Sequence, residues 1–201
     1  MPTSHLSLIL ASQSPQRRAL LAQEGYQFRV IAPRSTAECG ICSKETPGEL
    51  VARLARQKAA DIAERFAAGL PAASVIVGCD TVAECLGQIL GKPVDRGHAQ
   101  TMLRLLSGRE HHVYSGLCLW PAAGGNPRVR VAITRLRMET LGPDEIDQYL
   151  DSGQWEGKAG GFGLQDRPGW LHLVSGSESN VIGLPLELLA EMLNEWPPSV
   201  D

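Results

Sequence analysis

Short apolar runs along the chain alternate with longer segments in which apolar residues recur every three or four positions. The runs predict strands at Leu6–Ala11, Tyr26–Ile31, Ser74–Cys79, His112–Leu119 and Val129–Met138. The longer segments predict helices that begin near Pro15, Pro47, Asp95, Pro143 and Pro185. Because strands and helices alternate, the pattern predicts an α/β fold. The glycine-rich stretch Gly157–Gly183 is expected to be irregular, either as a plain loop or as one that follows a ligand closely.

The start of the first predicted helix has an unusual charge. Ser14 is a good N-cap and Pro15 suits the first helical position, so Arg17 and Arg18 fall in the first turn. The helix dipole disfavours cations there. The two arginines therefore point to an anion that binds at this helix end.

Two further charged residues sit in apolar surroundings. Lys58 lies on the apolar stripe of the helix that begins at Pro47, where it either extends its ammonium group to solvent or points into a cleft with anionic contents. Asp80 follows the apolar run Val75–Cys79, where it either brings a carboxylate to a site at the end of a buried strand or simply starts a turn.

Two lysines lie beside glycines, at Gly91-Lys92 and at Gly157-Lys158. Glycine lets backbone N–H groups approach a ligand, and lysine adds a mobile charge that suits phosphate. The Ser or Thr that follows the lysine of a nucleotide-binding P-loop is absent in both places. Together with Arg17, Lys58 and Asp80, these lysines suggest a polyphosphate substrate and a divalent metal ion.

The composition narrows the class of protein. The chain has 201 residues, of which 43% are hydrophobic and 20% charged, which fits one domain over residues 1–201. A net charge of -3 argues against broad binding to nucleic acid or membranes. No apolar run approaches the roughly 20 residues of a membrane span. Five scattered cysteines, including an incidental Cys39-x-x-Cys42, fit a cytoplasmic protein.

Seven stretches in series resemble the Maf family of nucleoside triphosphate pyrophosphatases. They are LILASQSPQRRALL (8–21), LARQKA (54–59), VGCDTV (77–82), GKPVD (91–95), MLRLLSGREHHVYSG (102–116), EGKAGGFGLQ (156–165) and SNVIGLPL (179–186). The resemblance implies an ITPase-like α/β fold with a curved mixed sheet and two lobes flanking a substrate cleft. It also implies cleavage of a nucleoside triphosphate to the monophosphate and pyrophosphate with Mg²⁺ or Mn²⁺, and a homodimer.

The resemblance assigns roles to individual positions. Asp80 matches the family's aspartate, which acts as base toward water or as a metal partner. The predicted catalytic residues are Asp80, Lys92 and Glu38, with Asp80 and Glu38 as metal ligands. The predicted substrate-binding residues are Ser12, Gln16, Arg17, Lys58, Thr81, Lys158 and Gln165. Lys92, Ser12, Arg17 and Lys58 match positions that contact the phosphates and ribose, and Thr81 and Gln165 match positions linked to base selection.

The sequence departs from the family pattern at two places. The acidic pair after the second strand is replaced by Arg34-Ser35-Thr36-Ala37-Glu38, so Glu38 is the candidate ligand and Glu45 the alternative. Gln16 occupies a position where the thymidine- and uridine-type members usually carry Arg and the methyl-guanosine-type members carry Trp.

Thr81 and Gln165 resemble the dTTP/UTP type, and methylated GTP is the alternative substrate. A different class of function, a regulator of cell division that senses nucleotides or nucleic acid with little turnover, stays open. His111 is interpreted as structural. Asn180 either holds the last loop against the cleft or is a turn residue.

Overall fold

The computed structural model describes residues 6–35, 45–66, 69–71, 73–166 and 169–196. One seven-stranded sheet carries helices on both faces, which confirms the predicted α/β class. The strands are β1 (Ser7–Ala11), β2 (Phe28–Val30), β3 (Ser74–Cys85), β4 (Gln88–Leu90), β5 (Glu110–Pro121), β6 (Arg128–Met138) and β7 (Leu171–Ser175). The helices are α1 (Pro15–Gln23), α2 (Pro47–Phe66), α3 (Arg96–Leu106), α4 (Pro143–Asp151), α5 (Glu178–Ile182) and α6 (Leu186–Asn194).

The sheet contains parallel and antiparallel strand pairs, and the pairing along one edge of β3 is interrupted. Its order is β2-β1-β3-β5-β6-β7, with β1 parallel to β2 and β3 and the other neighbours antiparallel. On one edge, β3 pairs with β1 as far as Gly78 and with β4 only from Ala83 onward. Between these two positions, none of the described strands pairs with that edge of β3. The break brings side chains from both faces of β3 to one opening.

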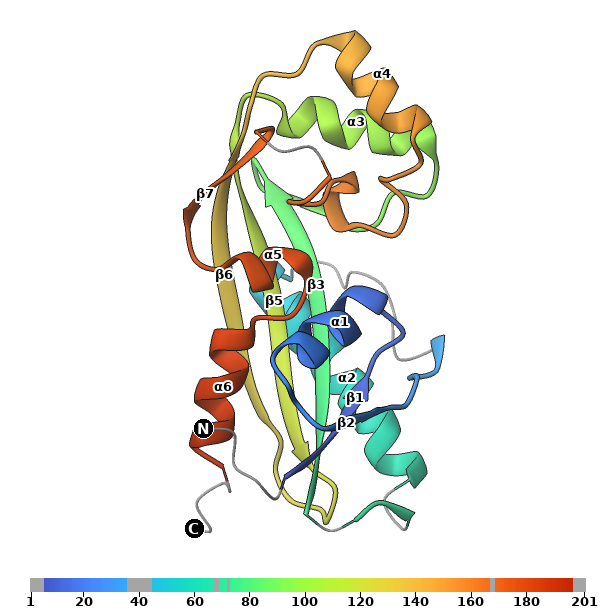
Figure 1. Cartoon of the computed structure of the whole chain (residues 1–201), viewed down its shortest axis with the longest axis vertical. Helices are drawn as coiled ribbons and strands as arrows, with labels where there is room; N and C mark the ends of the chain where they lie inside the picture. Colours follow the sequence, from blue (N-terminus) through green and yellow to red (C-terminus); the bar gives the residue numbers. More distant parts are fainter. Residues whose placement is uncertain (1–5, 36–44, 67–68, 72, 167–168, 197–201) are drawn as a thin grey trace.

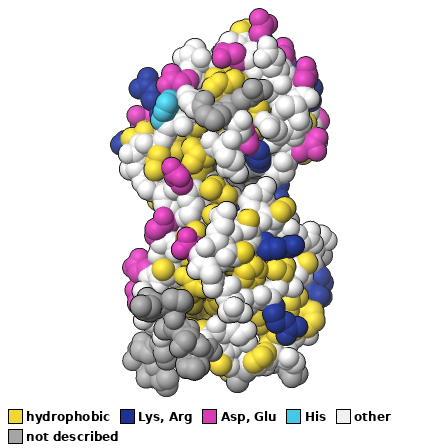
Figure 2. Space-filling model, viewed as in Figure 1, with side chains coloured by type: hydrophobic (Ala, Val, Ile, Leu, Met, Phe, Trp, Pro, Cys, Tyr) yellow, Lys and Arg dark blue, Asp and Glu magenta, His cyan; other side chains and the backbone are white. Residues whose placement is uncertain are grey.

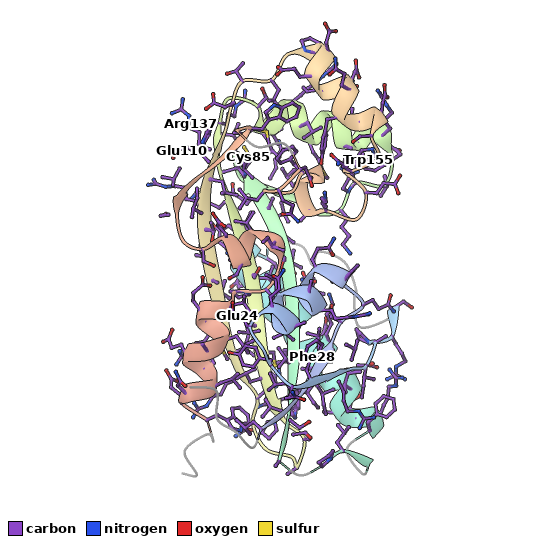
Figure 3. The ribbon with its side chains drawn as sticks, in the orientation of Figure 1. Glu24, Phe28, Cys85, Glu110, Arg137 and Trp155 are labelled. Atoms are coloured by element: carbon purple, nitrogen blue, oxygen red, sulfur yellow. The ribbon has the colours of Figure 1, made fainter. Side chains whose placement is uncertain are left out.

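The molecule has two lobes that share the long strands (Figure 1). One lobe holds α1, α2 and α6, and the other holds α3, α4 and a short 3₁₀ helix, Ala159–Gly161. Phe28 and Glu24 lie in the first lobe, and Cys85 and Trp155 lie in the second (Figure 3). The space-filling view narrows between the two lobes (Figure 2). None of the described helices is long and apolar enough to cross a membrane.

Helix α2 packs unusually close to the sheet. Its buried residues Ala55 and Ala59 contact the face that carries Ile76, whereas α1 and α6 cover the opposite face. A Cβ on Gly78 would lie 2.2 Å from the Ala55 carbonyl oxygen, and one on Gly116 would lie 2.1 Å from the Val51 carbonyl oxygen. Glycine on β3 and β5 therefore allows the approach that places α2, and with it Lys58, next to β3.

Several elements differ from the prediction. The third strand does not end at Cys79 but continues to Cys85, so Asp80 lies inside a strand and neither ends it nor starts a turn. The reason is that β5 pairs with β3 as far as Glu84, well beyond the end of β1. The stretch 157–183, expected to be irregular, contains β7 and α5.

Candidate functional site

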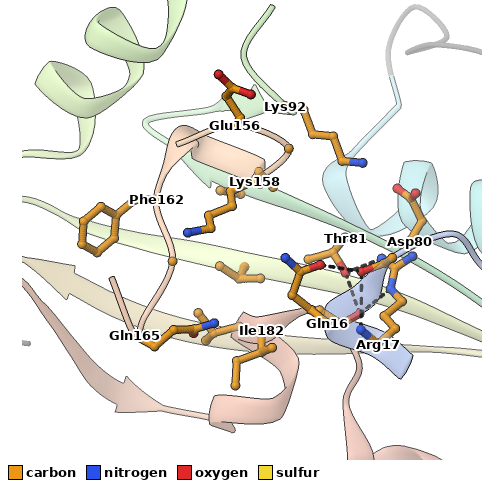
Figure 4. Close-up of a pocket in the computed structure, with 18 of the residues that line it drawn as sticks. Gln16, Arg17, Asp80, Thr81, Lys92, Glu156, Lys158, Phe162, Gln165 and Ile182 are labelled. Atoms are coloured by element: carbon orange, nitrogen blue, oxygen red, sulfur yellow. Dashed lines mark hydrogen bonds between the residues drawn. The ribbon is translucent and has the colours of Figure 1, made fainter. Parts of the chain in front are cut away.

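A cavity of about 480 Å³ opens at the break along β3. It is lined by the start of α1, the middle of β3, the loop after β4, the 3₁₀ segment and the end of α5, and so by both lobes. Figure 4 shows the side chains that face it. The predicted residues Ser12, Gln16, Arg17, Lys58, Asp80, Thr81, Lys92, Lys158 and Gln165 all line this cavity.

The start of α1 forms one wall. Ser14 is the N-cap, and its hydroxyl accepts a hydrogen bond from the Arg17 backbone N–H. The same hydroxyl donates to Gln16 Oε1 at 3.0 Å, so the Gln16 amide nitrogen faces the cavity (Figure 4). The buried Ser12 hydroxyl accepts from the Ser14 N–H at 3.1 Å. The positive end of the helix dipole therefore faces the cavity.

Arg17 is held in the cavity by neutral partners. Its Nε donates to the Gly183 carbonyl at 2.7 Å, and its Nη2 donates to Thr81 Oγ1 at 3.1 Å. Thr81 Oγ1 also lies 2.8 Å from Ser115 Oγ. Arg17 Nη1 also donates to the Ser12 hydroxyl at 3.4 Å. Gly183, Thr81 and Ser12 carry no charge at these atoms, so they orient the guanidinium without neutralising it. The exposed Arg18 is not among the lining residues, so one of the two predicted arginines reaches the cavity.

Lys58 and Asp80 form a largely buried ion pair, with Lys58 Nζ 2.6 Å from Asp80 Oδ1. The two side chains are 6% and 15% exposed. Of the two interpretations of Lys58, the structure therefore supports the lysine that points into a cleft. The ion pair also orients the Asp80 carboxylate at the cavity wall.

Lys92 follows β4 and lies on the same side of the cavity as Asp80 (Figure 4). The Gly91 carbonyl before it accepts a hydrogen bond from the Gly160 N–H at 3.0 Å, which joins this loop to the 3₁₀ segment. Lys158 differs from Lys92 because its ammonium group is bonded to Asp166. Glu156 also lines the cavity, although no pattern in the sequence marks it as a site residue.

The acidic candidates before α2 are only partly described. Glu38 lies outside the described residues, as do Cys39 and Cys42. Both carboxylate oxygens of Glu45 accept from Arg53, at 2.5 and 2.8 Å, and Glu45 does not line the cavity. Within the described ranges, no cluster of three His, Cys, Asp or Glu residues could hold a metal ion.

The part of the cavity nearest α3 and β6 is mostly apolar. Its lining includes Ala83, Leu106, Val113, Leu136, Met138 and Phe162. His111 also lines it and is only 3% exposed. Burial lowers the pKa of His111, which keeps its ring neutral at pH 7. His111 is thus buried, as a structural residue would be, but it also borders the cavity.

Asn180 ties the last segment to the sheet. Its side-chain amide donates to the Val113 carbonyl at 3.2 Å and to Thr134 Oγ1 at 2.8 Å, and the residue is 1% exposed. These contacts tie α5 to β5 and β6, and Asn180 lies inside this helix and not in a turn before a strand. The described cysteines Cys79, Cys85 and Cys118 are free and buried. Burial raises the pKa of Cys118 to about 12, so this thiol is not a nucleophile.

The fold and the site define an α/β protein whose cavity can hold a polyanion at one end and a flat apolar group at the other. Residues 7–196 match the family described as Maf-like protein. The chain belongs to the Maf family.

Two curated relatives, each named dTTP/UTP pyrophosphatase, cover nearly all of this chain. The protein of Rhodopirellula baltica is 50% identical over 97% of this chain and 84% of its own length. The protein of Pelotomaculum thermopropionicum is 38% identical over 94% of this chain and 96% of its own length. The Staphylococcus aureus Ham1 structure is 10% identical, with a TM-score of 0.50, over 94% of this chain and 98% of that one. This likeness supports the predicted curved sheet with two lobes.

Proposed function

We propose that this protein hydrolyses dTTP and UTP to the nucleoside monophosphate and pyrophosphate, with the help of a divalent metal ion. The observation that carries the proposal is the Lys58–Asp80 pair in a cavity that also holds Arg17 and the positive end of α1. The names of the curated relatives support the same activity.

The cationic end of the cavity suits the triphosphate chain. Arg17 offers a fixed guanidinium, and the first turn of α1 offers backbone N–H groups. Lys92 adds a second cation, on the Asp80 side of the cavity. These groups would neutralise the charge that builds on the leaving pyrophosphate as the bridging P–O bond breaks.

Asp80 is the proposed base. A water molecule would attack the α-phosphorus and form a new P–O bond, while the bond to the β-phosphate oxygen breaks and the water's proton passes to the Asp80 carboxylate. Lys58 would hold that carboxylate in place through its contact with Oδ1. The pair thus orients the base and also places a cation beside the reacting phosphate.

Asp80 also fits a metal ion, because a carboxylate oxygen is the ligand that Mg²⁺ and Mn²⁺ prefer. The described acidic residues do not complete a metal site by themselves. We therefore propose Asp80 and Glu38 as the protein ligands, with phosphate oxygens of the substrate as the others. A bound divalent ion would supply further neutralisation of the phosphate charge.

The apolar end suits the base. The side chains of Gln165 and Gln16 face the cavity, and each amide can donate and accept hydrogen bonds (Figure 4). An amide can pair with the O4 and N3–H edge that uracil and thymine share. Thr81 would act indirectly, because its hydroxyl already contacts Arg17 and Ser115.

Pyrophosphate release from a panel of common and methylated triphosphates tests the proposal. The wild-type protein should prefer dTTP and UTP, and Asp80→Asn should cut kcat roughly 10²–10⁴-fold with the fold intact. Asp151→Asn, at an exposed position on α4, is the matched control. Binding of triphosphate without release of pyrophosphate would favour the sensor alternative, and a higher kcat/KM for methylated GTP would contradict the choice of base.

A further inference from the structure

The turn that carries Gln165 is closed by an aspartate that sequence reasoning missed. The Asp166 N–H donates to the Gly163 carbonyl at 3.1 Å, which makes residues 163–166 a tight turn. The Asp166 side chain closes the same turn again, because its Oδ2 accepts from the Gly163 N–H at 2.7 Å. Gln165 is a central residue of this turn, so the turn geometry sets the direction of its side chain.

Asp166 also fixes the turn to the core of its lobe. The Tyr149 hydroxyl donates to Asp166 Oδ2 at 2.7 Å, and Tyr149 is fully buried on α4. The Tyr149 ring lies 5.0 Å from the Phe162 ring and 5.9 Å from the Trp170 ring, centroid to centroid. Phe162 and Trp170 flank the turn in the sequence, so aromatic packing and the carboxylate hold the same segment.

Lys158 neutralises this carboxylate. Its ammonium group pairs with Asp166 Oδ1, and the two side chains are 19% and 6% exposed. A carboxylate buried to this extent is costly unless it is paired and hydrogen-bonded. Lys158 thus provides the ion-pair partner of Asp166 inside the lobe, which is a different task from binding phosphate.

We propose that Asp166 is a positioning residue for base recognition, and that Lys158 acts through it. The pair fixes the turn of residues 163–166 so that the Gln165 amide meets the edge of the base. This inference rests on the proposed function, because it assigns a role in choosing the base of the same substrate. It also changes the role predicted for Lys158, from a phosphate ligand to a support for Gln165.

UTP and CTP make the most direct test, because they differ only at the edge that Gln165 would meet. Asp166→Asn should lower the ratio of kcat/KM for UTP to kcat/KM for CTP about tenfold. This factor corresponds to the free energy of about one hydrogen bond to a charged group. The loss should appear in KM for UTP, with kcat unchanged. Asp147→Asn is the matched control and should keep the wild-type ratio, because Asp147 is a half-exposed aspartate on α4 that contacts Arg96 and Gln100.

Lys158→Gln is the second variant, and it leaves the Asp166 carboxylate in place if Asp166→Asn fails to fold. Lys158→Gln should lower the same ratio, and the double variant should be no worse than either single variant. If Lys158 binds phosphate instead, Lys158→Gln will slow UTP and CTP equally, and its cost will add to that of Asp166→Asn. Either that result or an unchanged ratio in a folded Asp166→Asn protein would overturn the proposal.

Calorimetric binding of UMP and CMP separates this inference from the proposed function. If the wild-type protein hydrolyses neither triphosphate, the proposed function fails, but the binding ratio of the two monophosphates still measures recognition of the base. Loss of UMP preference in Asp166→Asn would support the role of Asp166. Equal binding of UMP and CMP by the wild-type protein would refute it.

Discussion

Replacing Gly78 with alanine should push α2 away from the sheet and separate Lys58 from Asp80. The new Cβ would lie 2.2 Å from the Ala55 carbonyl oxygen and 3.1 Å from the Ala59 Cβ. A carbon–oxygen contact needs about 3.3 Å, so the helix backbone must retreat by about 1 Å. Because Lys58 Nζ is now 2.6 Å from Asp80 Oδ1, the same retreat would take the pair out of hydrogen-bonding range.

The retreat should affect both stability and turnover. Overpacking of this kind costs about 1–3 kcal/mol in the free energy of unfolding. For a chain of 201 residues, a loss of about 2 kcal/mol lowers Tm by roughly 4–8 °C. A displacement of about 1 Å in a catalytic group can reduce kcat by up to about 10²-fold. We therefore expect a folded protein with a lower Tm and a larger relative loss in kcat than in substrate affinity.

Thermal unfolding and pyrophosphate release measure the two effects. Gly48→Ala is the matched control, because Gly48 lies in the first turn of the same helix and a Cβ there would meet nothing within 4 Å. Gly48→Ala should keep both the Tm and kcat of the wild-type protein or raise the Tm slightly. If Gly78→Ala melts with the wild-type protein and keeps its kcat, the close approach of α2 does not position Lys58.

Three further results are expected. Excess EDTA should abolish turnover and Mg²⁺ should restore it, whereas full activity in EDTA would rule out a metal ion. Glu38→Gln should raise the Mg²⁺ concentration needed for activity more than Glu45→Gln does. Thr81→Val should raise KM for dTTP about three- to tenfold by loosening Arg17, and an unchanged KM would show that Gly183 and Ser12 suffice to orient the guanidinium. Gln165→Glu should cost about 1–3 kcal/mol in pyrimidine recognition, and unchanged kcat/KM for UTP would remove Gln165 from the base site.

Sequence signals predicted those elements that have a local cause. Helix α1 begins at Pro15, after the Ser14 cap, and α2 begins at Pro47, both as expected. Strand β4 and helix α5 were missed because each spans five residues or fewer and depends on its tertiary neighbours. The length of β3 was underestimated because its second half is determined by pairing with β5, which no local pattern in the strand records.

The site residues likewise could be predicted only where their position depends on the local sequence and not on contacts with distant residues. The apolar stripe of α2 places Lys58 on the buried face, but its partner Asp80 lies 22 positions away on a strand, so the sequence left two interpretations open. Asp166 gave no signal, because an aspartate in a glycine-rich stretch of sequence is ordinary on any protein surface. Only the fold brings Tyr149 and Lys158 to the same carboxylate.

The continuity of the long strands determines how the cleft can open. β3, β5 and β6 each run through both lobes as single strands of 12, 12 and 11 residues, and they hydrogen-bond to one another along nearly their whole length. Continuous, paired strands therefore connect the two lobes in the described part of the chain, and a change in the angle between the lobes must twist these strands. Such twisting is elastic, so the two lobes should return to their original angle once the ligand leaves. A cut in any of these strands would damage both lobes, so the protein should not yield two separately stable halves on proteolysis.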